Sequence, residues 1–133
     1  MRKVLVVEDN SDNLRLITYA LRRRGYDVIS AETGIKGVEL AIAEHPAFIL
    51  MDINLPDIDG LEATRRIRRS SSNGTIPIIA ITSFAMSGDM DMVIAAGCNG
   101  YFEKPIDPLT IMDKIHALLG LAETDQTETG KQP

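Results

Sequence analysis

Five short apolar segments alternate along the chain with longer segments of helical character, and this alternation restricts the fold more than any other feature. The apolar segments, residues 3–7, 27–30, 47–51, 76–81 and 100–102, have the length of strands. Consecutive parallel strands need a crossover of about a dozen residues, which is usually a helix. The pattern therefore predicts an α/β fold, a doubly wound (βα)5 domain whose helices cover both faces of a five-stranded parallel sheet.

The polarity of these segments predicts their places in the sheet. Residues 3–7, 47–51 and 76–81 are almost continuously apolar, which is typical of parallel strands covered on both faces. Residues 27–30 and 100–102 are shorter and more polar. We expect these two strands at the sheet edges.

Five segments carry apolar residues at helical spacing, namely residues 11–24, 34–44, 61–69, 86–96 and 109–119. The first is the most clearly marked, because Leu14, Ile17 and Leu21 share one face and Gly25 stands just past the end. Either Asn10 or Ser11 is its expected N-cap.

Length and composition indicate one folded unit. A chain of 133 residues with 44% hydrophobic and 25% charged residues can bury roughly two-thirds of the surface that its unfolded form exposes. We assign residues 1–121 to this domain. Residues 122–133 lose apolar periodicity and consist mostly of small and polar residues, so we expect a flexible polar tail.

The composition disfavours several classes of function. A net charge of −5 argues against direct nucleic-acid binding, which needs a basic face. We expect the arginines of residues 22–24 and 65–69 on solvated faces, and His45 and His116 at the surface. The single cysteine, Cys98, rules out an intramolecular disulfide and a zinc site built on cysteines. No apolar run has the length of a membrane span or a secretion signal, so we expect a cytoplasmic protein without membrane partners.

Chemically selective residues follow four of the five predicted strands. In an open α/β sheet, ligands bind at the carboxyl ends of the strands. Residues 8–10, Glu-Asp-Asn, follow the first strand, Asp52 the third, Thr82 the fourth and Lys104 the fifth. We therefore expect three carboxylates, a hydroxyl and an ammonium group to converge at one edge.

This set of side chains suits metal-assisted phosphoryl chemistry. Crowded carboxylates raise one another's pKa unless a cation lies among them, and hard oxygen ligands suit Mg²⁺ or Mn²⁺. With the metal and Lys104 drawing off negative charge, an ionised Asp52 could attack a phosphoryl group and form an acyl phosphate. No His, Cys or Ser with a base partner stands at these positions, so a conventional hydrolase arrangement is missing.

Four blocks resemble the motifs of response-regulator receiver domains of the CheY-like superfamily. They are Val7-Glu8-Asp9-Asn10, the segment from Met51-Asp52 to Asp59-Gly60, Ile81-Thr82-Ser83, and Glu103-Lys104-Pro105. The resemblance covers about residues 3–119 and is greatest to stand-alone, single-domain regulators of the cell-cycle type. It implies a flavodoxin-like strand order 2-1-3-4-5 and a two-component phosphorelay switch, not an enzyme, although phosphorylation from small donors and autodephosphorylation are compatible with it.

The resemblance also implies a role for each site residue. Asp52 is the implied phosphoacceptor. The metal ligands are Glu8, Asp9, Asp52 and the backbone carbonyl of Asn54, and the phosphoryl-binding and switch residues are Thr82, Lys104 and Tyr101, with a cis peptide bond at Pro105. Asn54 and Phe84 flank the route of an attacking water, so a bulky Phe84 is expected to slow loss of the phosphoryl group.

The resemblance implies two kinds of protein partner, one that donates the phosphoryl group and one that receives the signal. A phosphohistidine on a histidine kinase or a phosphotransfer protein is the expected donor, and phosphorylation is expected to move the helix at residues 90–96. Because no second domain follows residue 119, we expect output to pass to a separate effector protein, unless the chain is a fragment of a larger regulator.

Plainer interpretations of the same residues remain. Asp52 could be a turn carboxylate, Glu8 and Asp9 could cap the first helix, and Tyr101 could be edge-strand packing.

Three other functions compete. An aspartate-nucleophile phosphohydrolase would need a carboxylate where Asn54 stands, and a nucleotide-binding domain would need a glycine-rich loop at residues 7–10. A receiver that only docks, without phosphorylation, is the third.

Overall fold

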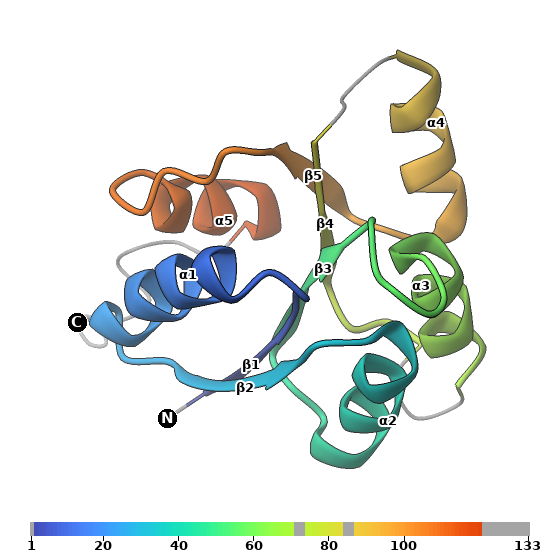
Figure 1. Ribbon diagram of the computed structural model, residues 1–133, viewed down its shortest axis with the longest axis horizontal. Coiled ribbons are helices and arrows are strands. Elements are labelled where there is room, and N and C mark those ends of the chain that lie inside the picture. The colour runs from blue at the N-terminus through green and yellow to red at the C-terminus, as the bar shows by residue number, and fades with distance from the viewer. Residues whose placement is uncertain (1, 71–73, 84–86, 121–133) are drawn as a thin grey trace.

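The computed structural model describes residues 2–70, 74–83 and 87–120, apart from the side chains of residues 87–89. Five parallel strands form one sheet: β1 Lys3–Val7, β2 Asp27–Ala31, β3 Phe48–Asp52, β4 Ile78–Thr82 and β5 Gly100–Glu103. Their order is β2-β1-β3-β4-β5 (Figure 1). The doubly wound fold and the strand order are both confirmed.

The places of the strands follow their polarity. In β3 and β4 every residue is buried, and in β1 only Lys3 keeps partial exposure. The outer strands β2 and β5 each have one sheet neighbour and retain exposed residues. The expectation that the second and fifth strands form the edges is therefore confirmed.

Five helices cover the sheet: α1 Ser11–Arg23, α2 Gly34–Glu44, α3 Gly60–Arg69, α4 Ser87–Ala96 and α5 Ile111–Leu119. In Figure 1, α1 and α5 lie on one side of the sheet and α2, α3 and α4 on the other. Two aliphatic cores result. Val4, Val6 and Leu50 pack with α1 and α5, whereas Leu5, Val7 and Ile49 pack with the other three helices.

Side-chain caps fix where three of the helices begin. The side chain of Asn10 accepts a hydrogen bond from the backbone N–H of Asn13 at 2.9 Å, so Asn10 rather than Ser11 is the N-cap of α1. Thr33 caps α2 and Asp59 caps α3 in the same way. Each cap satisfies a backbone donor that the first helical turn leaves without a partner.

Two predicted boundaries were wrong by two residues. Strand β4 begins at Ile78 rather than at residue 76, since Pro77 lacks the N–H that a central strand must donate. Helix α5 begins at Ile111 rather than at residue 109, because the Asp107 carboxylate accepts from the backbone N–H of Leu109 at 2.9 Å and holds a turn before the helix.

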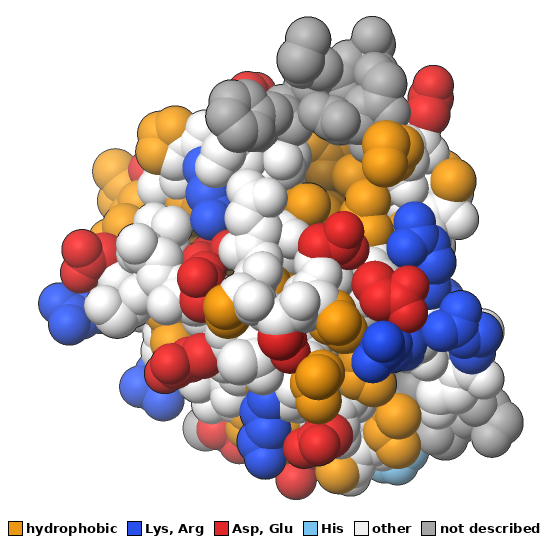
Figure 2. Space-filling view, turned by 45° about the vertical axis from the view of Figure 1, so that its right-hand side comes forward, with side chains coloured by type: hydrophobic (Ala, Val, Ile, Leu, Met, Phe, Trp, Pro, Cys, Tyr) orange, Lys and Arg blue, Asp and Glu red, His pale blue; other side chains and the backbone are white. Residues whose placement is uncertain are grey.

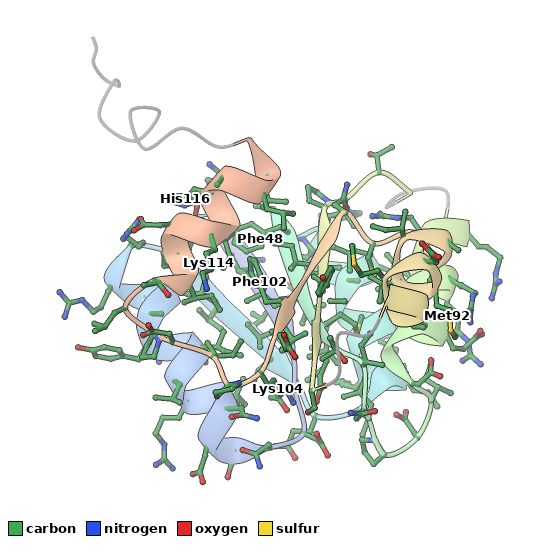
Figure 3. The ribbon with its side chains drawn as sticks, turned by 90° about the horizontal axis from the view of Figure 1, so that it is seen from above. Phe48, Met92, Phe102, Lys104, Lys114 and His116 are labelled. Atoms are coloured by element: carbon green, nitrogen blue, oxygen red, sulfur yellow. The ribbon has the colours of Figure 1, made fainter. Side chains whose placement is uncertain are left out.

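His116 is buried, and the expectation of an ordinary surface residue was wrong. Only 2% of it is exposed, and its Nε2 lies 3.0 Å from the hydroxyl of Tyr26. The ring of Tyr26 meets that of Phe48 edge-on at 5.5 Å (Figure 3 labels Phe48 and His116). Spacing explains the burial, because His116 follows Met112 by one helical turn on the inward face of α5.

The arginines of α3 divide between two environments. Arg65, Arg66 and Arg69 are exposed, as expected, and contact the Glu62 carboxylate. Arg68 is half-buried and donates to backbone carbonyls, so its expected place on a solvated face was wrong.

No helix among the described residues is long and apolar enough to cross a membrane. The predicted polar tail, residues 122–133, lies outside the described residues, and the domain boundary at residue 121 stays a prediction.

Replacing Tyr26 with Phe should lower the free energy of unfolding by about 1–2 kcal/mol, because the substitution removes a buried hydrogen bond to His116. Urea unfolding measures this change. Tyr19→Phe is the matched control, since Tyr19 is 57% exposed and its hydroxyl accepts a solvent-exposed hydrogen bond from Arg23 at 3.0 Å. It should change stability by less than about 0.5 kcal/mol. Equal losses in the two variants would contradict a stabilising role for the buried bond.

Candidate functional site

The sheet brings the predicted side chains together at its carboxyl edge. In the register of neighbouring strands, Val7 of β1 is opposite Met51 of β3, so Glu8 and Asp52 leave the sheet side by side. Lys104 follows β5 and reaches across this edge (Figure 3). Its Nζ lies 3.2 Å from Asp52 Oδ2 and 3.5 Å from Glu8 Oε1.

Three carboxylates form an acidic cluster beside this lysine. Glu8, Asp9 and Asp52 each present an oxygen atom within 4.8 Å of the others. Glu8 and Asp52 are only 1% exposed, whereas Asp9 is at the surface. Among the described residues, Glu8 Oε1 and Asp52 Oδ2 have no hydrogen-bond partner, although both face the Lys104 ammonium group. Buried carboxylate oxygens without partners are costly, and a hard cation would satisfy them.

The crowding of the carboxylates changes the pKa of Glu8. Burial, and then the neighbouring Asp52, raise the pKa of the Glu8 carboxyl to about 7. The backbone N–H of Asn10, which donates to Glu8 Oε2 at 3.2 Å, and the charge of Lys104 oppose this rise. In this arrangement Lys104 alone does not compensate two buried negative charges.

Gly60 allows the loop after Asp52 to fold back over β3. Its backbone N–H donates to the carbonyl of Ile53 at 2.8 Å. A Cβ atom at residue 60 would lie 2.1 Å from the backbone oxygen of Asp52, so no larger residue fits. The backbone N–H of Asn54 donates to Asp52 Oδ1 at 3.2 Å and orients the carboxylate.

Asp57 fixes the same loop to α2, a role that sequence reasoning missed. Its carboxylate accepts from the backbone N–H groups of Gly34 and Ile35 at 2.7 and 2.9 Å. Burial pushes the pKa of Asp57 upward, but these N–H donors outweigh it and the pKa is lowered. The available signal was an acidic residue in the loop together with Gly34 at a helix N-terminus, which favours anions.

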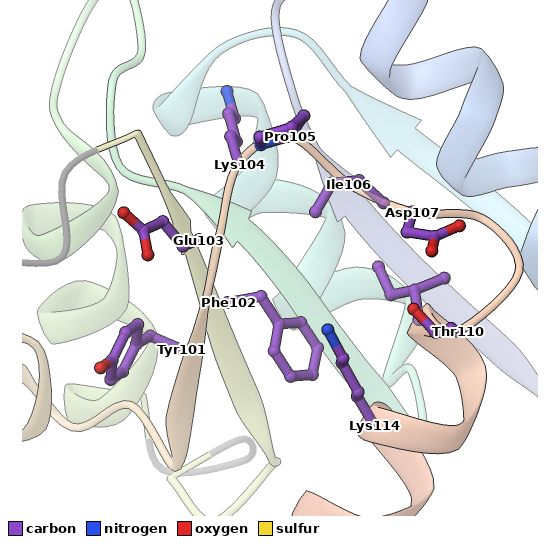
Figure 4. Close-up of a pocket in the computed structure, with 10 residues that line it drawn as sticks. Tyr101, Phe102, Glu103, Lys104, Pro105, Ile106, Asp107, Thr110 and Lys114 are labelled. Carbon is purple, nitrogen blue, oxygen red and sulfur yellow. The ribbon is translucent and has the colours of Figure 1, made fainter.

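Thr82 and Lys104 stand on adjacent strand ends. Thr82 is 7% exposed, and its carbonyl accepts from the backbone N–H of Lys104 at 2.7 Å. The Lys104–Pro105 peptide bond is cis, as the resemblance implied. Tyr101 is half-buried against the core beneath α4 and points to the opposite side of β5 from Phe102 (Figure 4). Phe84 lies outside the described residues.

Two cavities adjoin the site. One of about 240 Å³ lies between the loop after β3 and α4, lined by Ile53, Asn54, Asp59, Leu61, Thr82, Met92 and Val93. Another, of about 560 Å³, lies between β5 and α5 and shares Lys104 and Pro105 with the site (Figure 4). The first opens beside Thr82 and the second beside Lys104, so both residues have space next to them in which to move.

Basic and acidic side chains are interspersed on the face shown in Figure 2. No single-sign basic surface covers that face.

Comparison with known proteins gives the family. A family model described as the response regulator receiver domain matches residues 4–116. The polar-differentiation response regulator DivK of Brucella ovis is 38% identical over 119 residues, which cover 90% of this chain and 97% of DivK. The match to nearly all of a short regulator agrees with the resemblance to stand-alone receivers.

Solved structures share the fold. The receiver domain of the sensor histidine kinase PA1611 from Pseudomonas aeruginosa has a TM-score of 0.81 and 37% identity, over 90% of this chain and 98% of that one. It was solved with a magnesium ion coordinated in its active-site cleft. The chemotaxis response regulator CheY4 of Vibrio cholerae has a TM-score of 0.84 and 26% identity, over 89% and 98%. The chain belongs to the response regulator receiver domain family, whose members serve as switches in two-component phosphorelays.

In EDTA, the Glu8 carboxyl should titrate near pH 7, which carboxyl-carbon NMR measures directly. In Lys104→Met the midpoint should move higher, because the lost ammonium group favours the ionised carboxylate. Lys114→Met is the matched control, since Lys114 is an exposed lysine of α5 that takes no part in the acidic cluster. A midpoint near 4.5 in the native chain would contradict the crowding described above.

Proposed function

We propose that this receiver domain accepts a phosphoryl group on Asp52 with the help of Mg²⁺, and that the modified domain signals through altered protein contacts. One observation carries the proposal. Among the described residues, a buried Asp52 at the end of a central strand keeps an oxygen without a hydrogen-bond partner, 3.2 Å from the Lys104 ammonium group and beside Glu8. An oxygen so placed can act as a nucleophile once the neighbouring negative charge is neutralised.

The donor set fits a hard divalent cation. Glu8, Asp9, Asp52 and the backbone carbonyl of Asn54 would hold Mg²⁺, or Mn²⁺ in its place. The bound cation would offset the charge of the acidic cluster and of the phosphoryl oxygens. The magnesium-bound receiver of PA1611, at 37% identity, supports this assignment.

The expected donor is a phosphohistidine on a histidine kinase or a histidine phosphotransfer protein. An Asp52 carboxylate oxygen attacks phosphorus and forms the new P–O bond as the P–N bond of the phosphohistidine breaks. The electron pair of that bond passes to the imidazole nitrogen, which takes a proton from water. Lys104, 3.2 Å from Asp52 Oδ2, would pair with the phosphoryl oxygens during and after transfer.

The response would begin at the adjacent strand ends. A phosphoryl group adds about −1.5 to −2 charges and three acceptor oxygens. Thr82, at the end of β4, would donate its hydroxyl to one of them, while Pro105 holds Lys104 in place. Tyr101 would then turn inward beside α4, and the surface of α4, β5 and α5 would change for a separate effector protein.

The same site supports slower reactions without a kinase. A small donor such as acetyl phosphate would phosphorylate Asp52 directly, and water would later hydrolyse the acyl phosphate, with Asn54 flanking its route. These steps are self-catalysed and make the domain a switch rather than a conventional enzyme. We place its action in the cytoplasm, where histidine kinases present their phosphohistidine.

Incubation with Mg²⁺ and acetyl phosphate should add one phosphoryl mass to the native chain, and intact-protein mass spectrometry detects it. Asp52→Asn should gain none, because an amide is not a nucleophile of this kind. EDTA should block the adduct. Asp59→Asn is the matched control, since Asp59 is the N-cap of α3 and should load normally. The absence of an adduct with both acetyl phosphate and a phosphohistidine protein would favour a docking module that works without phosphorylation.

Mg²⁺ affinity should fall as pH drops below 7, the approximate pKa of the Glu8 carboxyl. Below that pH Glu8 is mostly protonated and must release its proton to bind metal, which weakens binding by about tenfold per pH unit. Above that pH the affinity should level off. Calorimetric titration between pH 5.5 and 8.5 measures the effect, and Glu8→Gln should bind more weakly but with a flatter pH profile. A profile for the native chain that is flat across pH 7 would rule out Glu8 as the coupled ligand.

A further inference from the structure

Arg68 faces away from the other arginines of its helix. Arg66 donates to Glu62 at 2.9 Å, and Arg65 and Arg69 lie 3.4 and 3.6 Å from the same carboxylate. Arg68, in the last turn of α3, instead reaches the corner between α4 and β5. Its guanidinium therefore has a role other than surface ion pairing.

The guanidinium of Arg68 joins three separate segments. Nε donates to the carbonyl of Gly97 at 2.9 Å, and Nη2 donates to Asn99 Oδ1 at 3.0 Å. Nη1 donates to the carbonyls of Gly74 and Ile76 just before β4. All four acceptors are uncharged, so hydrogen bonds rather than an ion pair hold the guanidinium. The planar guanidinium directs its donors at these four acceptors at once, which a lysine ammonium group could not do.

Two neighbouring residues are adapted to this arrangement. Asn99 Oδ1 also accepts from the backbone N–H of Ile78 at 2.8 Å, and the N–H of Asn99 donates to the Ile78 carbonyl at 2.7 Å, which ties β5 to β4. Gly97 has a φ of +113°, and a Cβ there would lie 2.8 Å from Arg68 Cγ. The glycine thus lets both the chain turn and the arginine lie against it.

The two ends of α4 are held very differently. Its last residue, Ala96, is buried and precedes the Gly97 carbonyl that Arg68 binds, and Val93 and Cys98 are buried as well. The outward face of α4 is exposed along its length, since Met90, Met92 and Ile94 are 42%, 54% and 53% exposed. In Figure 1 the C-terminal end of α4 lies beside α3, while its N-terminal end, nearer in sequence to Thr82, stands away from the sheet.

We infer that Arg68 is a positioning residue that anchors the C-terminal end of α4, so that a displacement arising at Thr82 turns the helix about this anchor. The inference rests on the proposed phosphorylation of Asp52. It means that the end of α4 next to Arg68 stays in place when the rest of the helix moves. A helix held at its C-terminal end is displaced more toward its N-terminal end, so the exposed side chains of Met90 and Met92 should move farther than that of Ile94. Without the anchor, the whole helix would shift and the corner with β5 would loosen.

Amide hydrogen exchange, measured by mass spectrometry before and after phosphorylation by acetyl phosphate and Mg²⁺, tests the anchor. In the native chain, phosphorylation should change exchange at residues 90–93 and leave residues 97–99 unchanged within about twofold. In Arg68→Met, the amides of residues 97–99 should exchange about tenfold faster before phosphorylation, and phosphorylation should change their exchange rate further. Arg69→Met, which removes the same charge from the exposed face of the same turn, should behave as the native chain.

A second variant keeps the test decisive if Arg68→Met does not fold. Arg68→Lys retains the charge and the apolar stem but loses the fork of donors, so it should show a smaller increase, about threefold, at residues 97–99. Native exchange at residues 97–99 in both Arg68 variants would overturn the inference, as would an equal phosphorylation response at both ends of α4 in the native chain. Intact mass reports separately on Asp52. A missing adduct contradicts the proposed function, whereas exchange at residues 97–99 before phosphorylation still decides whether Arg68 holds the corner.

Discussion

The burial of two carboxylates beside one ammonium group is the constraint on which the rest of the structure depends. Glu8 and Asp52 are almost completely buried, and Lys104 offers them one positive charge at 3.5 and 3.2 Å. Such a cluster is unstable by itself, since each ionised carboxylate disfavours the other. The domain maintains it because both residues extend from central strands whose side chains are packed on both faces. The stability of the sheet therefore holds in place a cluster that its own electrostatics would disperse.

The surrounding loops serve the same geometry. Asp57 binds the start of α2, and Gly60 lets the chain pass directly over the backbone of Asp52. Thr82 is linked to Lys104 through a backbone hydrogen bond, so the ends of β4 and β5 cannot move independently. A change in charge at Asp52 acts directly on Lys104, 3.2 Å away, and cavities lie beside both Thr82 and Lys104.

Much of this arrangement could be predicted from the sequence, because it depends on periodicity. The strands, helices and edge positions follow from apolar patterns, and the convergence of Glu8, Asp52 and Lys104 follows from the rule that strand ends meet at one edge. Other features depend on which way a side chain turns. His116 and Arg68 are polar residues in helices, and residue type alone predicted that both lie at the surface. Instead, His116 is buried against Tyr26, and Arg68 binds backbone carbonyls. Asp57 binds Gly34 and Ile35, which no local pattern pairs with it.

The sheet separates two cores, and this division has a consequence for how such a domain diversifies. Helices α1 and α5 pack on one face, whereas α4, which carries Met90 and Met92, packs on the other. Substitutions on opposite faces share few contacts and should combine nearly additively. Duplicated copies of such a domain can thus acquire new recognition properties on the exposed side of α1, while α4 on the opposite face stays unchanged. Two signalling pathways can then be kept separate without any change to the acidic cluster or to Lys104.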